Sequence, residues 1–261
     1  MSMNKTGVSV VILHNNQVEH LEKAVKSVEW ADEIIVIDHS PLEITKLVRQ
    51  TFNKSAHVRI VQRVFEGDFS KIRNSIWKDV HYSWCLFLDA DERCTPELHK
   101  QILGILHRNH LDGMYVYRSD YFLDRFLRFG ETSSNRFLRI VRTGKFIWRG
   151  SVHETLISKS KQASVSVFPK QASLLHYSYS TLTNFFQKID LYTTIASSYS
   201  SSSSAKNLIE LLIYPPAKFV KGYLFQQGFR DGVAGFCLSY FMSLHSVIVR
   251  IKRFEVARSQ G

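Results

Sequence analysis

The sequence predicts an α/β domain built on a mostly parallel, Rossmann-like sheet with helices on both faces. Between residues 8 and 118, apolar runs of strand length alternate with segments that show helical spacing. The runs are continuously apolar and rich in β-branched residues, which is typical of strands buried on both faces of a sheet. The predicted strands are Val8–Leu13, Glu33–Asp38, Val58–Val61, Trp84–Leu88 and Met114–Arg118.

The segments between these runs carry helix signals. The predicted helices are Val18–Val28, Pro41–Phe52, Phe69–Val80 and Thr95–Arg108. Ser40 and Thr95 are suitable N-caps, and Pro41 and Pro96 follow them at the first helical position. Strands that alternate with helices predict βαβ units, and proteins of this kind bind ligands beyond the carboxyl ends of their strands.

After this region the pattern changes. Arg136–Arg142 and Lys145–Arg149 are predicted to be short strands joined by a Thr143-Gly144 turn, which adds an antiparallel hairpin to the domain. Ser197–Ser204 contains seven serines in eight residues and is predicted to be a flexible connector.

The C-terminal segment is apolar and flanked by basic residues. Gly232–Val249 contains 18 uncharged residues, which borders on the length of a membrane span. Small or polar side chains recur along it at helical spacing, which weakens the spanning interpretation. They are Gly232, Gly235, Ser239, Ser243, Ser246 and Arg250. We expect an amphipathic helix on an anionic membrane surface, with internal packing and a true span as the alternatives.

Composition narrows the partners and the compartment. The formal net charge of +11 favours an anionic partner, whether nucleic acid, an acidic lipid surface or a phosphorylated substrate. Because no zinc spacing or RNA-binding motif is present, nucleic acid is not expected. The three cysteines fit neither a disulfide framework nor a zinc site, and the N-terminal residues do not resemble a signal peptide. We therefore expect a protein of the cytosol or of the cytosolic face of a membrane.

The strongest chemical signal is a pair of acids after a buried strand, in Leu86-Phe87-Leu88-Asp89-Ala90-Asp91-Glu92. Asp89 and Asp91 need a counter-charge there, and a hard divalent cation such as Mg²⁺ or Mn²⁺ is a suitable one. The alternative is that Asp91 and Glu92 favour the dipole of the helix that begins at Pro96. Asn15 and Asp38 also follow predicted strands, so these polar groups are expected at one edge of the sheet.

Several stretches, in this order and spacing, resemble the family 2 inverting glycosyltransferases of the GT-A fold, in the subgroup of lipopolysaccharide inner-core enzymes. The matching stretches are Val8–Asn15, Trp30–Asp38, Phe69–Asn74, Leu86–Glu92, Val152-His153-Glu154, Leu174–Tyr179 and Gly228–Phe236. The resemblance implies a GT-A catalytic domain over residues 1–180, with donor binding in 1–120 and the acceptor side in 121–180. A helical region for membrane or acceptor association would follow in 181–261.

The resemblance also implies roles in donor binding. Asp38 would contact the nucleoside, and Asn15 would take part in donor binding. Asp89 and Asp91 would hold the donor and the metal, with Asp91 the more direct metal ligand. Three side chains would lie near the sugar diphosphate, where cationic groups offset phosphate charge. They are Lys71, Arg73 and Asn74. The alternative for the two basic residues is an ordinary solvated helix face.

For the acceptor side, the resemblance points to Glu154 as the base that deprotonates the attacking hydroxyl group. His153 would contact the metal or a phosphate, or orient Glu154. His176 would reach the diphosphate or the metal, or else form a hydrogen bond within the fold.

The chain departs from the family pattern in three places. His14-Asn15-Asn16 stands where relatives read Lys-Asn-Glu, and Asp38–Glu43 replaces Asp-Ser-Gly-Ser-Thr-Asp. These two changes bear on the preferred nucleotide. Asn135 stands where many relatives carry an acid, which bears on an acceptor or base contact.

The resemblance implies transfer of a sugar from a nucleotide diphosphate donor, by default UDP-glucose, to a lipopolysaccharide core or another lipid-linked glycan. The enzyme would be peripheral on the cytoplasmic face of the inner membrane. The alternative hypothesis is a membrane-associated scaffold that has kept the fold and lost the activity.

Overall fold

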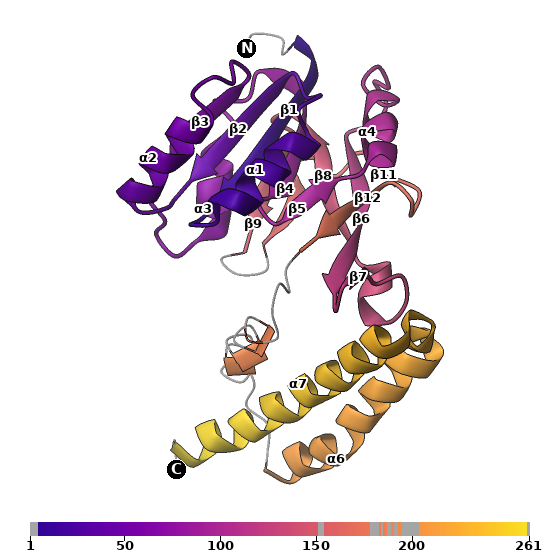
Figure 1. Ribbon diagram of the computed structural model, residues 1–261. Coiled ribbons are helices and arrows are strands. Elements are labelled where there is room, and N and C mark those ends of the chain that lie inside the picture. The colour runs from indigo at the N-terminus through magenta and orange to yellow at the C-terminus, as the bar shows by residue number, and fades with distance from the viewer. Residues whose placement is uncertain are drawn as a thin grey trace. The chain divides into compact units, whose positions relative to one another are not determined.

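The computed structural model describes residues 5–150, 154–177 and 204–259, with isolated residues between 183 and 194 (Figure 1). The chain divides into two compact units, and each is described by itself. The first contains Met1–Arg118 and Arg136–His176, and the second contains Ser119–Asn135 and Tyr177–Gly261. Apart from Ser204, which begins a helix, the predicted connector Ser197–Ser204 lies outside the described residues.

The first unit is built on one large sheet of strand order β3-β2-β1-β4-β8-β6-β12-β5. The first four strands of that order are parallel to one another. They are β3 (Val58–Gln62), β2 (Glu33–Asp38), β1 (Lys5–His14) and β4 (Tyr82–Asp89). The others are β8 (Arg136–Arg142), β6 (Gly113–Phe122), β12 (Ser173–His176) and β5 (Glu92–Cys94). Strand β8 is antiparallel to both β4 and β6, and β5 is antiparallel to β12. Two short strands pair with β6, namely β7 (Arg125–Phe126) and β11 (Val165–Val167).

The parallel strands end at a common edge. His14 of β1 is the register partner of Asp38 in β2, and Leu13 is the partner of Asp89 in β4. Asp38 in turn is the partner of Gln62 in β3. The side chains that were predicted at strand ends are therefore brought to one edge of the sheet, as the βαβ pattern requires.

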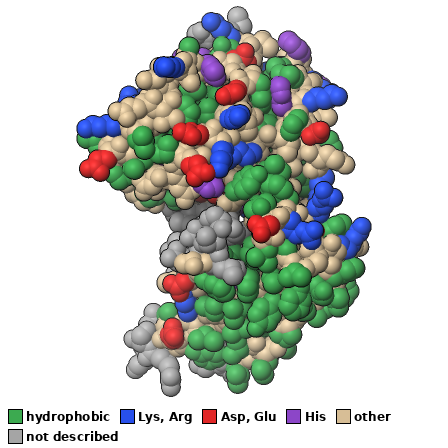
Figure 2. Space-filling model, viewed as in Figure 1, with side chains coloured by type: hydrophobic (Ala, Val, Ile, Leu, Met, Phe, Trp, Pro, Cys, Tyr) green, Lys and Arg blue, Asp and Glu red, His purple; other side chains and the backbone are tan. Residues whose placement is uncertain are grey.

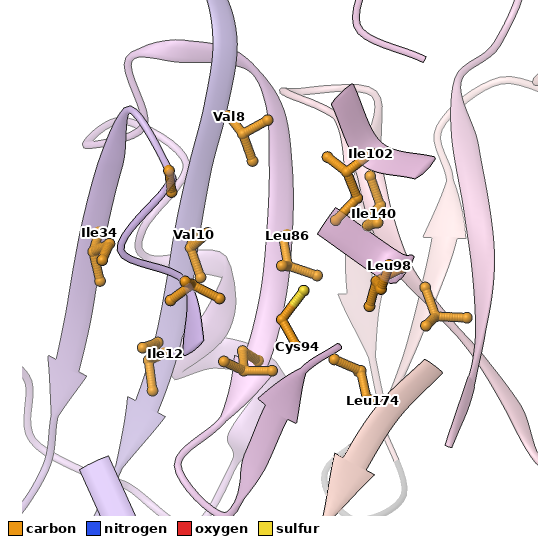
Figure 3. Packing of buried hydrophobic residues seen from close by; sticks show 14 of the residues in the cluster. Val8, Val10, Ile12, Ile34, Leu86, Cys94, Leu98, Ile102, Ile140 and Leu174 are labelled. Carbon is orange, nitrogen blue, oxygen red and sulfur yellow. The ribbon is translucent and has the colours of Figure 1, made fainter. Parts of the chain in front are cut away.

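Both faces of the sheet are covered, which confirms the predicted fold class. Alternate residues of β1 enter different cores: Val10 and Ile12 pack into one cluster, and Val11 and Leu13 pack into the other. The first cluster is shown in Figure 3. It receives side chains from α1 (Val18–Ser27), α2 (Leu42–Thr51) and α4 (Pro96–Leu103). The second cluster receives Ile72 from α3 (Phe69–Asn74).

The helix signals near the site are only partly confirmed. Thr95 caps α4 by accepting a hydrogen bond from the Leu98 N–H at 3.2 Å, with Pro96 at the first position, as predicted. At α2, Pro41 itself occupies the cap position and provides no side-chain cap. The Ser40 hydroxyl instead accepts a hydrogen bond from the Asn16 N–H at 2.9 Å, which ties the ends of β1 and β2 together.

An added antiparallel hairpin is present, but its strands are not the predicted pair. β9 (Phe146–Arg149) pairs with β10 (Thr155–Ser158), whereas β8 lies in the main sheet. The turn at Gly144 forms with a positive φ of 78°. However, β8 buries four consecutive residues, 138–141, and a strand buried on both faces belongs in the middle of a large sheet.

The second unit contains a helical hairpin. Its elements are α6 (Ser204–Val220), the π-helical turn η2 (Lys221–Phe225), the 3₁₀ turn η3 (Gly228–Asp231) and α7 (Gly232–Ser259), preceded along the chain by the 3₁₀ turn η1 (Glu131–Ser134). The buried Asp231 carboxylate accepts hydrogen bonds from the Arg128 and Phe129 N–H groups at 2.9 and 2.8 Å. Within the described residues, Gly228–Val256 is the one helical segment long and apolar enough to cross a membrane, judged by length and composition alone. All three cysteines are free.

Candidate active site

The end of β4 carries Asp89 between two arginines. Arg73 from α3 donates through Nη2 to Asp89 Oδ1 at 2.6 Å, and Arg139 from β8 donates through Nη2 to Oδ2 at 2.8 Å. Both arginine side chains are buried, whereas the Asp89 carboxylate keeps 28% of its side-chain surface exposed. Asp89 is therefore held by a guanidinium group on each of its oxygens.

These contacts set the charge state of Asp89. Burial by itself raises the pKa of a carboxyl group, but the charges and hydrogen bonds of Arg139 and Arg73 outweigh it and hold the pKa of Asp89 well below its usual range. Asp89 is thus ionised at all physiological pH values. With both oxygens engaged, it is a counter-ion of the two arginines in this structure.

Arg73 also joins Asp89 to Glu154, the predicted base. Its Nε donates to Glu154 Oε1 at 3.0 Å, and its guanidinium lies 4.8 Å from the ring centroid of Trp148 in β9. The planar group is thereby fixed by two acids and one aromatic face. The structure brings together three residues that were predicted separately, namely Arg73, Asp89 and Glu154.

Arg139 is a part of the site that the sequence analysis missed, and Glu92 was expected only as an acid near the helix that begins at Pro96. The fully buried Glu92 accepts a hydrogen bond from the Asp89 N–H through Oε2 at 3.0 Å and contacts Arg139 Nη2 through Oε1 at 3.3 Å. Burial, together with the charge of Asp89, raises the pKa of Glu92, although Arg139 opposes the shift. One signal was available: Arg139 is a charged residue within the apolar run of a predicted strand.

Asp91 faces a different partner. Its Oδ2 lies 3.5 Å from His176 Nε2, because β12 pairs with β5 and places His176 opposite Glu92. A carboxylate and an imidazole suit Mn²⁺, and Mg²⁺ or Mn²⁺ commonly takes only one or two protein ligands when phosphates complete the shell. Among the described residues no group of three or more His, Cys, Asp and Glu side chains is arranged to hold a metal. Asp91 and His176 are thus two neighbouring side chains whose chemistry suits a divalent cation.

At the neighbouring strand ends, Asp38 is completely buried. Its Oδ1 lies 3.0 Å from His14 Nδ1 and accepts a hydrogen bond from the Ser40 N–H at 3.2 Å. Burial raises the pKa of Asp38, but the hydrogen bonds from His14, Thr45 and Ser40 outweigh it and place the pKa far below its usual range. His14 thus occupies the position next to Asp38 where the family pattern has a lysine.

A pocket of about 530 Å³ opens beside this pair, beyond the ends of β2 and β3. Its lining residues are His39, Ser40, Pro41, Gln62, Arg63, Val64 and Phe65. The His39 and Phe65 rings lie 5.3 Å apart, and Phe65 lies 4.5 Å from Phe69 at the start of α3. Aromatic faces with polar groups at their margin suit a flat heterocycle.

The remaining predicted residues lie as follows. The Asn74 side chain donates to the Trp148 carbonyl and accepts from the Trp148 N–H, both at 2.9 Å, so it ties α3 to β9. Lys71 and Asn15 are exposed near the same edge. His153 lies outside the described residues.

A parallel sheet with acids and arginines at its carboxyl edge is typical of an α/β enzyme that binds a phosphorylated ligand there. The model of Glycosyl transferase family 2 matches residues 9–176, and the chain belongs to this family. The predicted resemblance and the GT-A fold class are thereby confirmed.

The chain is also similar to a curated protein and to solved structures. The lipopolysaccharide core biosynthesis glycosyltransferase LpsC of Rhizobium meliloti (strain 1021) is 23% identical over 260 residues, which cover 96% of this chain and 93% of that protein. The S. aureus TarS 1-349 structure has a TM-score of 0.49 at 13% identity and covers 97% of this chain and 92% of that one. A longer TarS chain has a TM-score of 0.47 at 15% identity and matches 87% of this chain, which spans only 46% of that TarS chain.

Proposed function

We propose that this protein is an inverting glycosyltransferase that transfers a sugar from a nucleoside diphosphate sugar, by default UDP-glucose, to a hydroxyl group of a lipopolysaccharide core or another lipid-linked glycan. The observation that carries the proposal is the Arg73 bridge between Asp89 and Glu154, at the carboxyl edge of the parallel strands in a chain that belongs to family 2. The acceptor class is supported by the name of LpsC, which is similar along nearly its whole length.

Glu154 is proposed as the base. The acceptor oxygen attacks the anomeric carbon from the side opposite the diphosphate, and its proton passes to a Glu154 carboxylate oxygen. A new bond forms between the anomeric carbon and the acceptor oxygen. The bond to the phosphate oxygen breaks, and the nucleoside diphosphate leaves with its electron pair. A single displacement of this kind inverts the anomeric configuration.

Arg73 and Arg139 have a second proposed task on the donor side. Both are buried cations at the carboxyl edge of the sheet, where a diphosphate would lie in an α/β fold. Their positive charge would lower the energy of the leaving diphosphate. Lys71 would add a mobile charge from the exposed face of α3. The aromatic pocket beside Asp38 suits the base of the nucleoside.

A divalent cation, Mg²⁺ or Mn²⁺, is proposed to be held by Asp91 and His176. When bound, it would neutralise charge on the leaving diphosphate. Asp89, whose oxygens are engaged by two arginines, would contribute to the site by holding those arginines rather than by direct ligation. A role for His153 stays a prediction from the sequence.

The test is a donor panel. The purified protein would be incubated with Mn²⁺, several nucleotide sugars and an extracted core acceptor, and products would be read by mass and by the anomeric coupling constant. Turnover of one donor with inverted configuration is expected. Glu154→Gln should bind that donor normally and lose about 10²–10⁴-fold in transfer. If no donor is bound or turned over, the inactive-scaffold alternative replaces the proposal.

A further inference from the structure

The second unit exposes an unusual number of large apolar side chains. Among the described residues, 13 of the 23 large hydrophobics that are clearly exposed lie between Leu208 and Ile251. Three of the four most exposed belong to this group: Phe225 at 81%, Val233 at 74% and Leu212 at 69%. Figure 2 shows hydrophobic side chains gathered over α6 and α7. Large contiguous patches of this kind mark surfaces that bind something.

The exposed side chains follow helical spacing on both arms of the hairpin. On α6, Ile209, Leu212 and Ile213 are exposed, and Val220 continues the row. The second exposed row begins in η3 and continues along α7, through residues three or four positions apart, as on one face of a helix. The row consists of Phe229, Val233, Phe236 and Tyr240. We call these two rows, with Leu224 and Phe225 of η2, the apolar face.

Aromatic contacts join the two rows into one surface. Phe236 of α7 lies 5.8 Å from Phe219 of α6 and 5.7 Å from Tyr223 of η2, measured between ring centroids. The helices otherwise bury small and polar groups between them: Ser239 and Ser246 are buried, and the Ser243 hydroxyl donates to the Pro215 carbonyl at 2.7 Å. Polar groups therefore lie between the two helices, and α7 also buries Ala234 and Leu238 in an apolar cluster. The two rows remain exposed although these other side chains are buried.

Charge is arranged around the apolar face and not on it. Gly232–Val249 has no charged residue, and burial lowers the pKa of His245, which keeps that ring neutral. Residues 205–261 carry eight basic and three acidic side chains, a net charge of +5. Lys221 and Arg230 are exposed beside Phe225 and Phe229 at the turn of the hairpin. An uncharged face bordered by cations complements an anionic lipid surface.

We propose that the apolar face of α6 and α7 lies in the interface of an anionic phospholipid bilayer, with the hairpin parallel to the membrane plane. This role rests on the proposed function, since a lipid-linked acceptor is what would bring the enzyme to a membrane. The sequence predicted membrane contact only for residues 232–249, whereas the apolar face also includes residues of α6 and η2.

Hydrogen bonds at both ends of α7 favour the parallel orientation over a span. At its start, Asp231 binds the N–H groups of Arg128 and Phe129. Towards its end, Lys252 donates to the Asp190 carboxylate and the Thr194 hydroxyl, both at 2.6 Å. A transmembrane α7 would put these two polar segments on opposite sides of the bilayer. An α7 that lies parallel to the membrane plane leaves both polar segments on the same side of the bilayer.

The first test is flotation of the full-length protein with vesicles. Wild type should float with vesicles of equal phosphatidylcholine and phosphatidylglycerol, and less with phosphatidylcholine alone. Leu212→Glu and Phe225→Glu should each weaken binding by at least about tenfold, because each replaces a membrane-buried apolar side chain with a charge. Leu47→Glu, at a 46% exposed leucine on α2, is the matched control and should bind like wild type. Equal binding by all four proteins overturns the proposal.

A second measurement does not depend on charged variants folding. A fluorophore would be attached to the single cysteine introduced by Leu212→Cys, Phe225→Cys, Val233→Cys or Ile251→Cys. Lipids that carry a quencher at a shallow or a deep position would then report the depth of each label. An interfacial hairpin predicts shallow quenching at all four positions. A steady change of depth from 233 to 251 would show a span instead, and no quenching at any position would overturn membrane contact.

The competing occupant is a second copy of this chain. Light scattering without lipid should report a monomer. A stable dimer that dissociates on Leu212→Glu, together with no vesicle binding, would assign the face to self-association. Donor turnover with a water-soluble acceptor separates this question from the proposed function. Donor turnover should be unchanged in Phe225→Glu. Glu154→Gln should abolish transfer and still float with vesicles like wild type.

Discussion

Arg73 donates through Nε to Glu154 Oε1 at 3.0 Å, so the proposed base is held by the same side chain that binds Asp89. A planar guanidinium can serve two acids at fixed angles, whereas an ammonium group cannot reproduce both contacts. The position of the base is therefore coupled to the donor side of the site through a single residue.

The first prediction concerns this bridge. Arg73→Lys should lower kcat more than it raises KM, because it misplaces Glu154 while retaining a positive charge near the donor. Arg73→Ala should also cost about 3–5 kcal/mol of unfolding free energy, since it breaks a buried ion pair. Steady-state kinetics and denaturant unfolding measure the two effects. Arg59→Lys, in the more exposed pair with Glu33, is the control; a wild-type kcat in Arg73→Lys would contradict the coupling.

The second prediction concerns the metal. His176→Ala should weaken Mn²⁺-dependent donor binding by about 10–100-fold, the range seen when even a group that orients a metal ligand is lost. Asp91→Asn should have a larger effect because it removes the carboxylate ligand. Calorimetric titration of the donor, with and without Mn²⁺, separates the metal-dependent part. Unchanged titrations in both variants would remove these two residues from the metal site.

The sequence predicted much of the fold because its signals are local. The apolar runs predicted the strands β1 to β4 in their order along the chain, and the Thr95 cap predicted the start of α4. The βαβ rule predicted that Asp38 and Asp89 lie at one edge of the sheet. The predicted pairing of β9 with Arg136–Arg142 was wrong, because the pairing of short strands depends on how the whole strand is buried. The continuous burial of β8 became visible only in the assembled sheet.

The site was predicted in part for the same reason. Motif resemblance identified Arg73, Asp89 and Glu154 as separate candidates, and the structure joined them through one guanidinium. Arg139 was missed because it lies in a strand that inserts between β4 and β6, out of chain order. A contact across non-consecutive strands leaves no periodic signal in one sequence.

The third prediction concerns pH. The pKa of Asp89 is lower in the folded state than in the unfolded state, where it is about 3.9. Ionisation of Asp89 therefore stabilises the fold fully at pH values above the unfolded-state pKa. This stabilisation is lost as the pH falls towards the folded-state pKa. The difference in unfolding free energy between wild type and Asp89→Asn should therefore be largest near neutral pH and shrink below about pH 5. Denaturant unfolding across the acid range measures this difference. A difference that stays constant with pH would contradict the assigned ion pairs.

The fourth prediction concerns the turn of the helical hairpin. A Cβ at Gly235 would clash with the carbonyl oxygen of Gly228, a contact that neither backbone can relieve without moving. Gly235→Ala should lower the melting temperature and disturb the packing of α7 on η3. Gly104→Ala is the control, because a Cβ there meets atoms at ordinary contact distances of 3.4 and 3.7 Å. Equal melting temperatures in the two variants would contradict this packing.

The arginines around Asp89 have a consequence for how the enzyme is assembled. Asp89, Glu92 and Glu154 are matched by the guanidinium groups of Arg73, Arg118 and Arg139, so the acids at the sheet edge are balanced by the chain itself. Many metal sites fold only when the ion neutralises their ligands. Asp89, Glu92 and Glu154 need no cation to neutralise them in the folded chain. A chelator should therefore stop the proposed sugar transfer and leave the unfolding curve unchanged.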